Sequence, residues 1–222
     1  MGCVEKSTSA RKEELFNAVN TSPAGFTVSP ARFIVLEGID QAGKKTQTRL
    51  LVARLRKSGF KTTSLSFPIY NTPAGRQIRA FLSGRSAPPL EALHMLYSLN
   101  RWENKTRILK TLKSCDVVVA DRYTGSNLAY GTAHGLSLRW LAGLDEGLPK
   151  PDAVIVVDVP VPSAFRRKKE KRDTHENDGA FLLRAKTAYL RLARKYSWKI
   201  IRGTGSTEQV HKNIWNIIRK VL

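Results

Sequence analysis

The chain has 222 residues, enough for one large hydrophobic core, and its 41% hydrophobic and 25% charged residues are typical of globular proteins. With two cysteines, apolar runs too short to cross a bilayer and no secretion signal, it is expected to be a cytoplasmic protein without disulfides or a membrane segment. Its 38 Lys and Arg against 18 Asp and Glu give a net charge of +20, which fits a polyphosphate substrate, a nucleic-acid partner or simple surface composition.

Organised structure is predicted to begin near residue 31. Residues 1–30 show little apolar periodicity, so we expect a flexible extension ahead of a single domain, residues 31–222. The apolar run 33–37, FIVLE, predicts a buried strand that ends at Gly38. A helix is predicted over 46–58, because leucines recur at helical spacing and a glycine follows.

The rest of the chain alternates in the same way. Strands are predicted at 61–67, 116–121, 152–159 and 198–201, and helices at 74–83, 90–113, 181–192 and 210–221. The strands are continuous apolar runs, which is typical of strands covered on both faces. The pattern therefore predicts an α/β fold with a parallel sheet and helices on each side. Ligands of such sheets bind at the carboxyl ends of the strands, where Gly38, Phe67 and Asp121 fall.

Residues 38–47, GIDQAGKKTQ, contain a phosphate-binding loop that departs from its pattern at one position. Gly38, Gly43 and Lys44 match G-x-x-x-x-G-K-[ST], in which backbone N–H groups and the lysine bind phosphates. Lys45 stands where a Ser or Thr hydroxyl normally holds magnesium. The residues predicted to bind ATP are Gly38, Gln41, Ala42, Gly43, Lys44, Lys45 and Thr46.

Lys45 raises the question of how magnesium is held. An ammonium group has no lone pair to offer and repels a metal ion. We expect Lys45 to turn toward phosphate or toward an acid such as Asp121 or Glu37, while ATP, water and Asp121 hold the ion.

A second acidic landmark is Asp121. It ends the apolar strand 116–121 as a Walker B acid does, so we expect it to orient Mg²⁺ through water. Arg122 follows and would face the same cleft. Without further context, a structural salt bridge explains this pair equally well.

The chain also resembles the thymidylate kinases, with which it shares, in order and spacing, the segments EGIDQAGKKTQ, FPIYNTPAGRQIRAFL, YSLNRWE, DRYTGSNLAYG, GLPKPDAVIVVDV and ENDGAFLLRAKTAYLRLA. The motifs NRWE and DRYxxSxxAY are much more specific than the phosphate-binding loop. The resemblance runs from about Phe33 to the C-terminus. It implies the P-loop nucleoside monophosphate kinase fold, with a five-stranded parallel sheet and a small lid. It also implies γ-phosphoryl transfer from ATP, with Mg²⁺, to dTMP in dTTP synthesis, by a homodimer.

The resemblance assigns residues to the dTMP site. It places Phe67 and Tyr97 against the thymine, and lets Arg101 donate a hydrogen bond to the base. Asp40 corresponds to the family acid that accepts from the sugar 3′-hydroxyl, and Arg122 to the clamp on the acceptor phosphate. Without the resemblance, Tyr97 would be interpreted as a core aromatic residue.

The same comparison places two residues of the next helix at the sugar. Ser126 and Tyr130 lie four residues apart and so share a helix face. Tyr130 matches the family tyrosine that closes the space beneath C2′ and favours deoxyribose.

The expected lid is residues 166–178, which include the basic run RRKKEKR. In some family members the catalytic arginines come from the lid. Because Gln41 of the phosphate-binding loop is uncharged, we expect Arg166, Arg167 or Arg172 to close over the phosphates. Arg172 therefore joins Lys44, Asp121 and Arg122 as a predicted catalytic residue.

Two departures leave alternatives open. Tyr70 stands where many relatives have a phosphate-binding arginine, and Gly131 where glutamine is common. The alternatives are another P-loop nucleotide or deoxynucleoside kinase, or a catalytically impaired relative that binds nucleotides or nucleic acid. A nucleic-acid groove would need aromatic residues among the basic ones, and the run at 166–172 has none, which argues against that partner.

Overall fold

A computed structural model describes residues 31–167 and 178–222. The predicted extension, residues 1–30, and most of the predicted lid lie outside the described residues, and so does Arg172. In the described part of the chain, no helix is long and apolar enough to cross a membrane.

The sheet has five parallel strands in the order β2-β3-β1-β4-β5. Their bounds are β1 Arg32–Glu37, β2 Thr62–Ser66, β3 Val117–Asp121, β4 Ala153–Asp158 and β5 Lys199–Arg202. This confirms the predicted α/β class and the five-stranded parallel sheet. In the central register Leu36 pairs with Asp121, so the phosphate-binding loop after β1 and the Asp121–Arg122 corner after β3 leave the sheet side by side.

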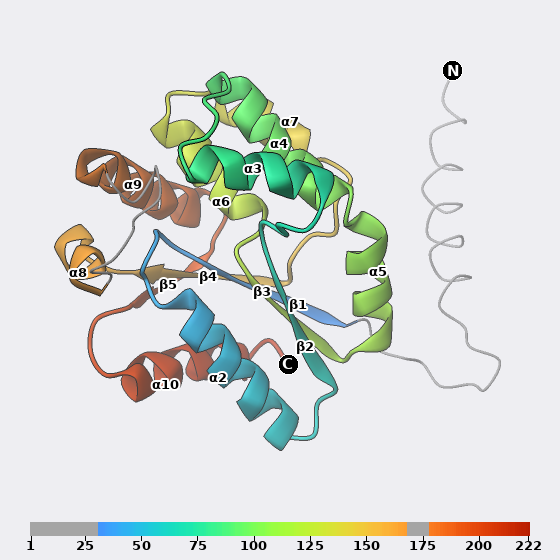
Figure 1. The fold of residues 1–222 in the computed structure, drawn as a ribbon. Helices are drawn as coiled ribbons and strands as arrows, with labels where there is room; N and C mark the ends of the chain where they lie inside the picture. Colours follow the sequence, from blue (N-terminus) through green and yellow to red (C-terminus); the bar gives the residue numbers. More distant parts are fainter. Residues whose placement is uncertain (1–30, 168–177) are drawn as a thin grey trace, which may run out of the picture. The chain divides into compact units, whose positions relative to one another are not determined.

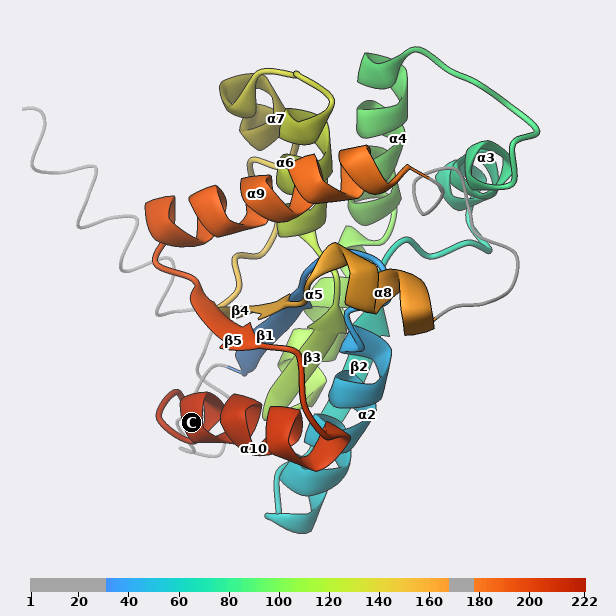
Figure 2. The same ribbon diagram turned by 90° about the vertical axis from the view of Figure 1, so that its left-hand side faces the viewer.

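Helices cover both faces of the sheet, as predicted. Figure 2 shows α2 and α10 on one side and α4, α6, α7 and α9 on the other. The helices are α2 Lys44–Lys57, α3 Pro73–Leu82, α4 Leu90–Trp102, α5 Lys105–Ser114, α6 Thr124–Ala133, α7 Leu138–Leu144, α8 Val161–Arg167, α9 Gly179–Lys195 and α10 Thr207–Ile218 (Figure 1). The seven-residue helices α7 and α8 were not predicted, because two turns are too short to establish an apolar period.

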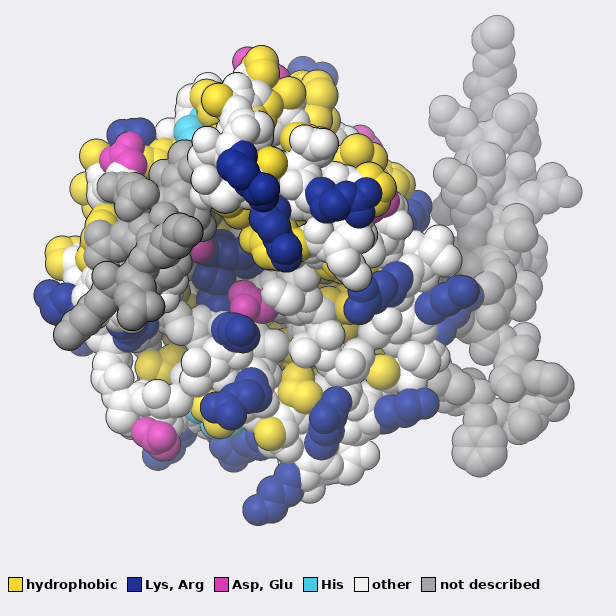
Figure 3. Space-filling model, viewed as in Figure 1, with side chains coloured by type: hydrophobic (Ala, Val, Ile, Leu, Met, Phe, Trp, Pro, Cys, Tyr) yellow, Lys and Arg dark blue, Asp and Glu magenta, His cyan; other side chains and the backbone are white. Residues whose placement is uncertain are grey.

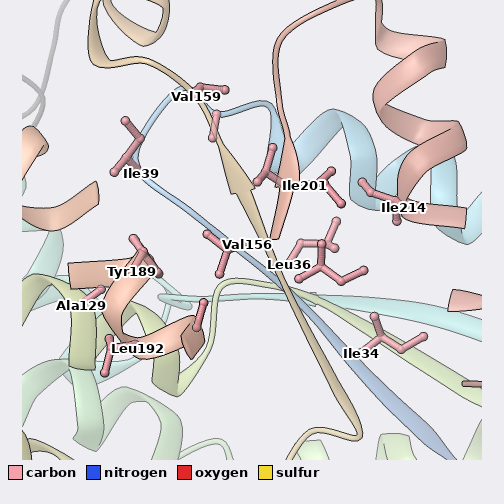
Figure 4. Close-up of a cluster of buried hydrophobic side chains, with 14 of the residues drawn as sticks. Ile34, Leu36, Ile39, Ala129, Val156, Val159, Tyr189, Leu192, Ile201 and Ile214 are labelled. Atoms are coloured by element: carbon pink, nitrogen blue, oxygen red, sulfur yellow. The ribbon is translucent and has the colours of Figure 1, made fainter. Parts of the chain in front are cut away.

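Alternate residues of the central strand enter different hydrophobic clusters. Ile34 and Leu36 belong to the larger cluster, which includes Leu51 of α2 and Ile214 of α10 (Figure 4 shows part of it). Phe33 and Val35 belong to the second cluster, with residues of β2, β3 and α5. Burial of one such aliphatic side chain contributes about 1.5–3 kcal/mol. The solid apolar runs of the sequence therefore reflect a sheet buried on both sides.

The predicted helix 90–113 is two helices, α4 and α5. Near Asn104 the backbone tightens, because its N–H bonds to the carbonyl of Arg101, three residues back, at 3.2 Å. The side-chain amide of Asn104 donates a hydrogen bond to the carbonyl oxygen of Asn100 at 2.7 Å. This local side-chain competition ends α4 at Trp102, and α5 starts at Lys105. The prediction of one continuous helix was wrong because the apolar period runs across the break.

Candidate active site

The phosphate-binding loop leaves β1 at Gly38, and any other residue there would force the neighbouring backbone to shift. A Cβ on Gly38 would lie 2.6 Å from the carbonyl oxygen of Val157 on the adjacent strand β4, and φ is +139°. The loop therefore passes close to the sheet before turning into α2, whose N-terminus faces the same end. The motif has the strand–loop–helix context that phosphate binding requires.

Lys44 folds back onto the loop. Its Nζ donates to the carbonyls of Gly38 at 3.0 Å and Ile39 at 2.8 Å, and the side chain is buried. Burial, and then the positive charge of Arg122, lower the pKa of Lys44 to about 8. The group is thus an ammonium at neutral pH that anionic phosphate oxygens would stabilise further.

Lys45 lies in solvent rather than against an acid. The side chain is exposed and forms no hydrogen bond or ion pair with residues 31–167 or 178–222. Lys45 does not pair with Glu37, because four hydrogen bonds from other groups already occupy the Glu37 carboxylate. That Lys45 turns toward phosphate stays a prediction. The neighbouring Thr46 is exposed as well.

Glu37 is a fully buried carboxylate at the end of β1 that organises α6. Its Oε1 accepts from the backbone N–H groups of Tyr123 and Ser126 at 2.9 and 3.0 Å. Its Oε2 accepts from Ser126 Oγ at 2.7 Å and from Tyr189 Oη at 2.9 Å. A side chain of another strand thus satisfies the first turn of α6, which has no side-chain cap of its own. Burial raises the pKa of Glu37, while Ser126 and Arg122 oppose that rise.

Gly125 gives this carboxylate room. A Cβ there would lie 2.9 Å from Glu37 Oε1 and 3.0 Å from Trp198. The glycine lets α6 approach β1 closely, and this brings Ser126 and Tyr130 to the site.

Arg122 is the centre of the polar network. Its Nη2 lies 2.5 Å from Asp40 Oδ1, and Tyr130 Oη donates to the other oxygen, Oδ2, at 2.5 Å. Its Nη1 donates to the carbonyl of Gly38 at 3.0 Å, to Ser126 Oγ at 3.0 Å and to Tyr189 Oη at 3.3 Å. Burial by itself would lower the pKa of Arg122, but Asp40, Tyr130, Tyr189 and Asp121 together outweigh it, and the pKa is raised. The structure thus brings together four residues that were predicted separately.

A cavity of about 90 Å³ opens beside this network. It is lined by Asp40, Phe67, Pro68, Tyr70, Leu82, His94, Tyr97, Asn100, Arg101, Arg122, Tyr123, Ser126, Asn127 and Tyr130. All seven residues predicted for dTMP binding are among them. The cavity combines aromatic walls with a charged floor, which suits a flat base that carries a polar tail.

Arg101 lines this cavity and also forms an ion pair that the sequence did not reveal. Its Nε and Nη2 donate to Asp145 at 2.7–3.1 Å, and both side chains are buried. Asp145 lies just after α7, far from the NRWE motif in sequence. The arginine is therefore held rigidly at the cavity wall.

A buried histidine is a second contributor that the sequence did not reveal. Nδ1 of His94 lies 2.7 Å from Oδ1 of Asn127, whose Nδ2 donates to the His94 carbonyl at 3.2 Å. Burial lowers the pKa of His94. The neutral ring, with its proton on Nδ1, fixes the side-chain amide of Asn127 at the cavity wall.

The two departures from the family pattern have different structural settings. A Cβ on Gly131 would lie 2.5 Å from Leu141 Cδ1, so a larger residue there would displace the Leu141 side chain of α7. Tyr70, by contrast, lines the cavity.

An arginine of the predicted lid region does lie against the phosphate-binding loop. Nη1 of Arg167 donates to the carbonyl of Gln41 at 3.1 Å, and Nη2 to the carbonyl of Gly203 at 2.8 Å. Arg166 instead donates to Ser163 Oγ at 3.1 Å on the surface of α8. Of the three arginines considered for the phosphates, Arg167 is at the loop, and Arg172 lies outside the described residues.

The acidic residues near the phosphate-binding loop suit a magnesium ion that is bound mainly by a polyphosphate. They do not form a site in which several protein side chains hold the metal. The described residues contain no group of three or more His, Cys, Asp or Glu that could hold a metal ion. Asp121 is half-exposed and close enough to Lys44 to oppose the fall in its pKa. One hard carboxylate beside the phosphate-binding loop matches the usual way Mg²⁺ is held, with phosphates and water as its other ligands.

Sequence patterns could have pointed to Glu37, since a charged residue at the end of a solid apolar strand needs partners. Nothing local points to Asp145, Tyr189 or His94, because their partners lie more than thirty residues away.

Comparisons with known proteins agree with this architecture. A sequence model of the family described as thymidylate kinase matches residues 36–214. Human thymidylate kinase is 36% identical over 184 residues, covering 82% of this chain and 86% of the human protein. A probable thymidylate kinase of Pyrococcus abyssi is 36% identical over 199 residues, covering 86% and 97%. The structure of thymidylate kinase from Candida albicans matches with a TM-score of 0.78 at 28% identity, covering 87% of this chain and 93% of that one. The chain belongs to the thymidylate kinase family.

Proposed function

We propose that this protein transfers the γ-phosphoryl group of ATP to dTMP, giving dTDP, with the donor at the phosphate-binding loop and the acceptor in the adjoining cavity. The observation that carries the proposal is the Arg122–Asp40 pair, which lies both at the end of β3 beside the loop and on the floor of the cavity. A phosphate bound over this pair would lie next to the γ-phosphate, as in-line transfer requires.

On the donor side, backbone N–H groups of the loop and Lys44 would bind the ATP phosphates. Lys44 would exchange its two carbonyl partners for phosphate oxygens. Arg167, already at the loop, would add positive charge where negative charge develops in the transition state. Mg²⁺ bound with ATP would neutralise phosphate charge, with Asp121 holding it through water and Lys45 taking no part in its coordination.

On the acceptor side, the thymine would lie between the aromatic walls that include Phe67 and Tyr97, with Arg101 donating to its edge. Tyr130 and Asp40 would contact the sugar. The acceptor phosphate needs no general base, because its second pKa is about 6 and the attacking oxygen is already deprotonated at neutral pH. Positioning and charge neutralisation would therefore account for most of the catalysis.

The test is phosphoryl transfer from ATP to dTMP, dUMP, UMP and thymidine. A coupled assay of ADP release measures the rate, and chromatography identifies the products. We expect turnover with dTMP and none with thymidine, which lacks the acceptor phosphate. Turnover with thymidine would instead indicate a deoxynucleoside kinase. Nucleotide binding without any turnover would indicate an impaired relative.

We also propose a homodimer that forms through α4. Its outer surface exposes Met95 by 48% and Leu99 by 50%, one helical turn apart. Two apolar side chains on one helix face suit a self-complementary two-fold contact, which buries about 800 Å² per partner in typical complexes. Sedimentation of wild type and of Met95→Glu/Leu99→Glu would test it, since only the wild type should sediment as a dimer. A monomeric wild type at micromolar concentration would contradict the proposal.

A cytoplasmic location remains a proposal as well. It is supported by Cys115, a free thiol in the structure, and by the absence of a disulfide framework in the sequence.

A further inference from the structure

A second groove lies at the edge of the sheet opposite to the phosphate-binding loop. Residues 145–154, where β4 begins, and residues 196–199, where β5 begins, line it together with residues of α6, α7 and α10. Because the strands are parallel, this edge is the one away from the candidate active site. Figure 2 shows the turn between α9 and β5 on the left of the view and α8 on the right. The groove volume of about 820 Å³ lies within the range of about 300–1,000 Å³ that ligand sites commonly have.

The turn between α9 and β5 presents two aromatic rings to this groove. Tyr196 and Trp198 stack, with ring centroids 5.6 Å apart and planes at 28°, and 40% of Tyr196 is exposed. The N–H of Tyr196 donates to the carbonyl of Leu192 at 2.8 Å, which ties the turn to α9. Trp198 packs against α6 so closely that a Cβ on Gly125 would lie 3.0 Å from its ring. The two rings therefore form a fixed platform that is accessible at Tyr196.

Basic side chains surround this platform. Lys195 Nζ lies 5.9 Å from the centre of the Tyr196 ring, and Lys199 directly follows Trp198. Three basic residues line the groove itself, and we call them the groove cations: Arg139, Lys150 and Lys199. All three are exposed, and none of them forms an ion pair within residues 31–167 and 178–222.

The carboxylates of the groove leave most of this positive charge uncompensated. Asp145 is already paired with Arg101 at 2.7 Å, and Asp152 lies 3.6 Å from Arg32. Glu146 lines the groove and is exposed, without an ion pair in the part of the chain that the structure describes. The groove cations therefore outnumber the lining carboxylates that lack a partner, and the groove is complementary to an anion.

Positive charge alone does not distinguish this groove, because the whole protein carries +20. Figure 3 shows Lys and Arg side chains spread over the face that carries α2 and α3, with few acidic ones. The groove differs in combining cations with a stacked aromatic pair. Its segment 194–199, RKYSWK, places aromatic residues among basic ones, which the run at 166–172 does not do. This combination is typical of surfaces that bind single-stranded nucleic acid.

We propose that this groove binds single-stranded nucleic acid, with a base stacked on Tyr196 and backbone phosphates at the groove cations. A single strand carries a flat base for every phosphate, so it matches an aromatic ring that lies beside cations. A duplex hides the faces of its bases, and an acidic peptide carries its charges without flat rings. Neither stacking nor phosphate contact reads the 2′-hydroxyl, so DNA and RNA share these contacts. The groove thus gives the protein a binding activity separate from the proposed phosphoryl transfer.

The experiment measures the fluorescence anisotropy of a labelled DNA single strand of about 12 nucleotides, a length in the range that such sites cover, on titration with the full chain. ADP and dTMP are present at saturation to fill the candidate active site. We expect a dissociation constant in the micromolar range at about 50 mM salt, and weaker binding as salt rises. Tyr196→Ala leaves the net charge unchanged and should weaken binding about 5- to 100-fold, whereas Tyr196→Phe should retain it.

The groove cations are tested through the salt dependence. Lys199→Gln should weaken binding and reduce the slope of log affinity against log salt by about 0.7, as expected for the loss of one phosphate contact. Lys57→Gln is the matched control, because Lys57 is an exposed lysine at the far end of α2 that does not line the groove. Its affinity should stay within about twofold of the wild type, since salt screens a distant charge. The duplex of the same sequence and a polyglutamate peptide should both bind more weakly than the single strand.

The proposal is overturned if Tyr196→Ala binds the strand as tightly as the wild type, or if Lys57→Gln weakens binding as much as Lys199→Gln. It is also overturned if the duplex or the peptide binds as tightly as the single strand, because charge alone would then account for binding. A strand that binds only in the absence of ADP and dTMP would lie in the candidate active site, which contradicts the proposal as well. No part of the test requires phosphoryl transfer, so its outcome is independent of the proposed function.

Discussion

Arg122 and Asp40 join the ends of two neighbouring strands, with Nη2 2.5 Å from Oδ1. Arg122 reaches this position with φ at +64°, a conformation uncommon for a residue with a side chain. Such a backbone costs on the order of 1–3 kcal/mol and persists where the surroundings hold it. Here the Arg122 N–H donates to the carbonyl of Leu36 at 3.0 Å, and the guanidinium serves four acceptors. The strain turns the side chain across the phosphate-binding loop.

The first prediction concerns Tyr130, whose hydroxyl donates to the other oxygen of Asp40. Tyr130→Phe should preserve the preference for dTMP over ribothymidine 5′-monophosphate, because the ring excludes the 2′-hydroxyl. Tyr130→Ala should relax that preference by removing the ring. The measurement is kcat/KM for both acceptors, and undiminished discrimination in the alanine variant would show that another group excludes ribose.

The second prediction concerns the stability of the Arg101–Asp145 pair. Asp145→Asn should lower the free energy of unfolding by about 3–5 kcal/mol, because it leaves a buried guanidinium without its counter-charge. Arg101→Met/Asp145→Leu should recover much of this loss, since neither charge is then buried. Urea unfolding measures both.

Arg32→Gln is the control for this pair. Arg32 lies 3.6 Å from Asp152 and 44% of its side chain is exposed, so its loss should cost less than about 1 kcal/mol. Equal costs for Asp145→Asn and Arg32→Gln would show that burial of the Arg101 pair does not matter.

The third prediction concerns pH and Lys44. Since burial lowers its pKa to about 8, the ammonium is present in the free protein below pH 8 and is lost above it. ATP favours the charged form, so its binding takes up a proton above pH 8 and its affinity should fall as pH rises through 8. The measurement is the ATP dissociation constant as a function of pH, from about 1.5 units below pH 8 to about 1.5 units above it. Lys44→Arg should give a flat profile, and a flat wild-type profile would contradict the prediction.

The fourth prediction concerns Lys45. Because its exposed ammonium gives magnesium no ligand, Lys45→Ser should lower the magnesium concentration that supports half-maximal turnover. Manganese–ATP should also bind more tightly to the serine variant, as followed by electron paramagnetic resonance. Lys57→Ser, a change at the far end of the same helix, controls for net charge. A wild type without activity at any magnesium concentration, beside an active serine variant, would contradict the kinase function.

The sequence by itself determined the strands, the parallel sheet and the phosphate-binding loop. These follow from local signals: solid apolar runs and glycines at a turn. The seven residues proposed for dTMP, which line one cavity, came instead from the resemblance to the thymidylate kinases. The sequence pattern did not predict the break between α4 and α5, because a side-chain amide competes with the helix there. Apolar periodicity carries no information on such an interaction.

The tertiary structure alone decided which charged and polar groups are partners. Arg101 and Asp145 are 44 residues apart, and Glu37 and Tyr189 are 152 apart, so only the packing of α4, α7 and α9 over the sheet brings them into contact. The sequence therefore named Arg101 and Arg122, while only the fold showed that Asp145 and Asp40 are their counter-charges, because electrostatic pairing is set by distance in space and not by spacing along the chain.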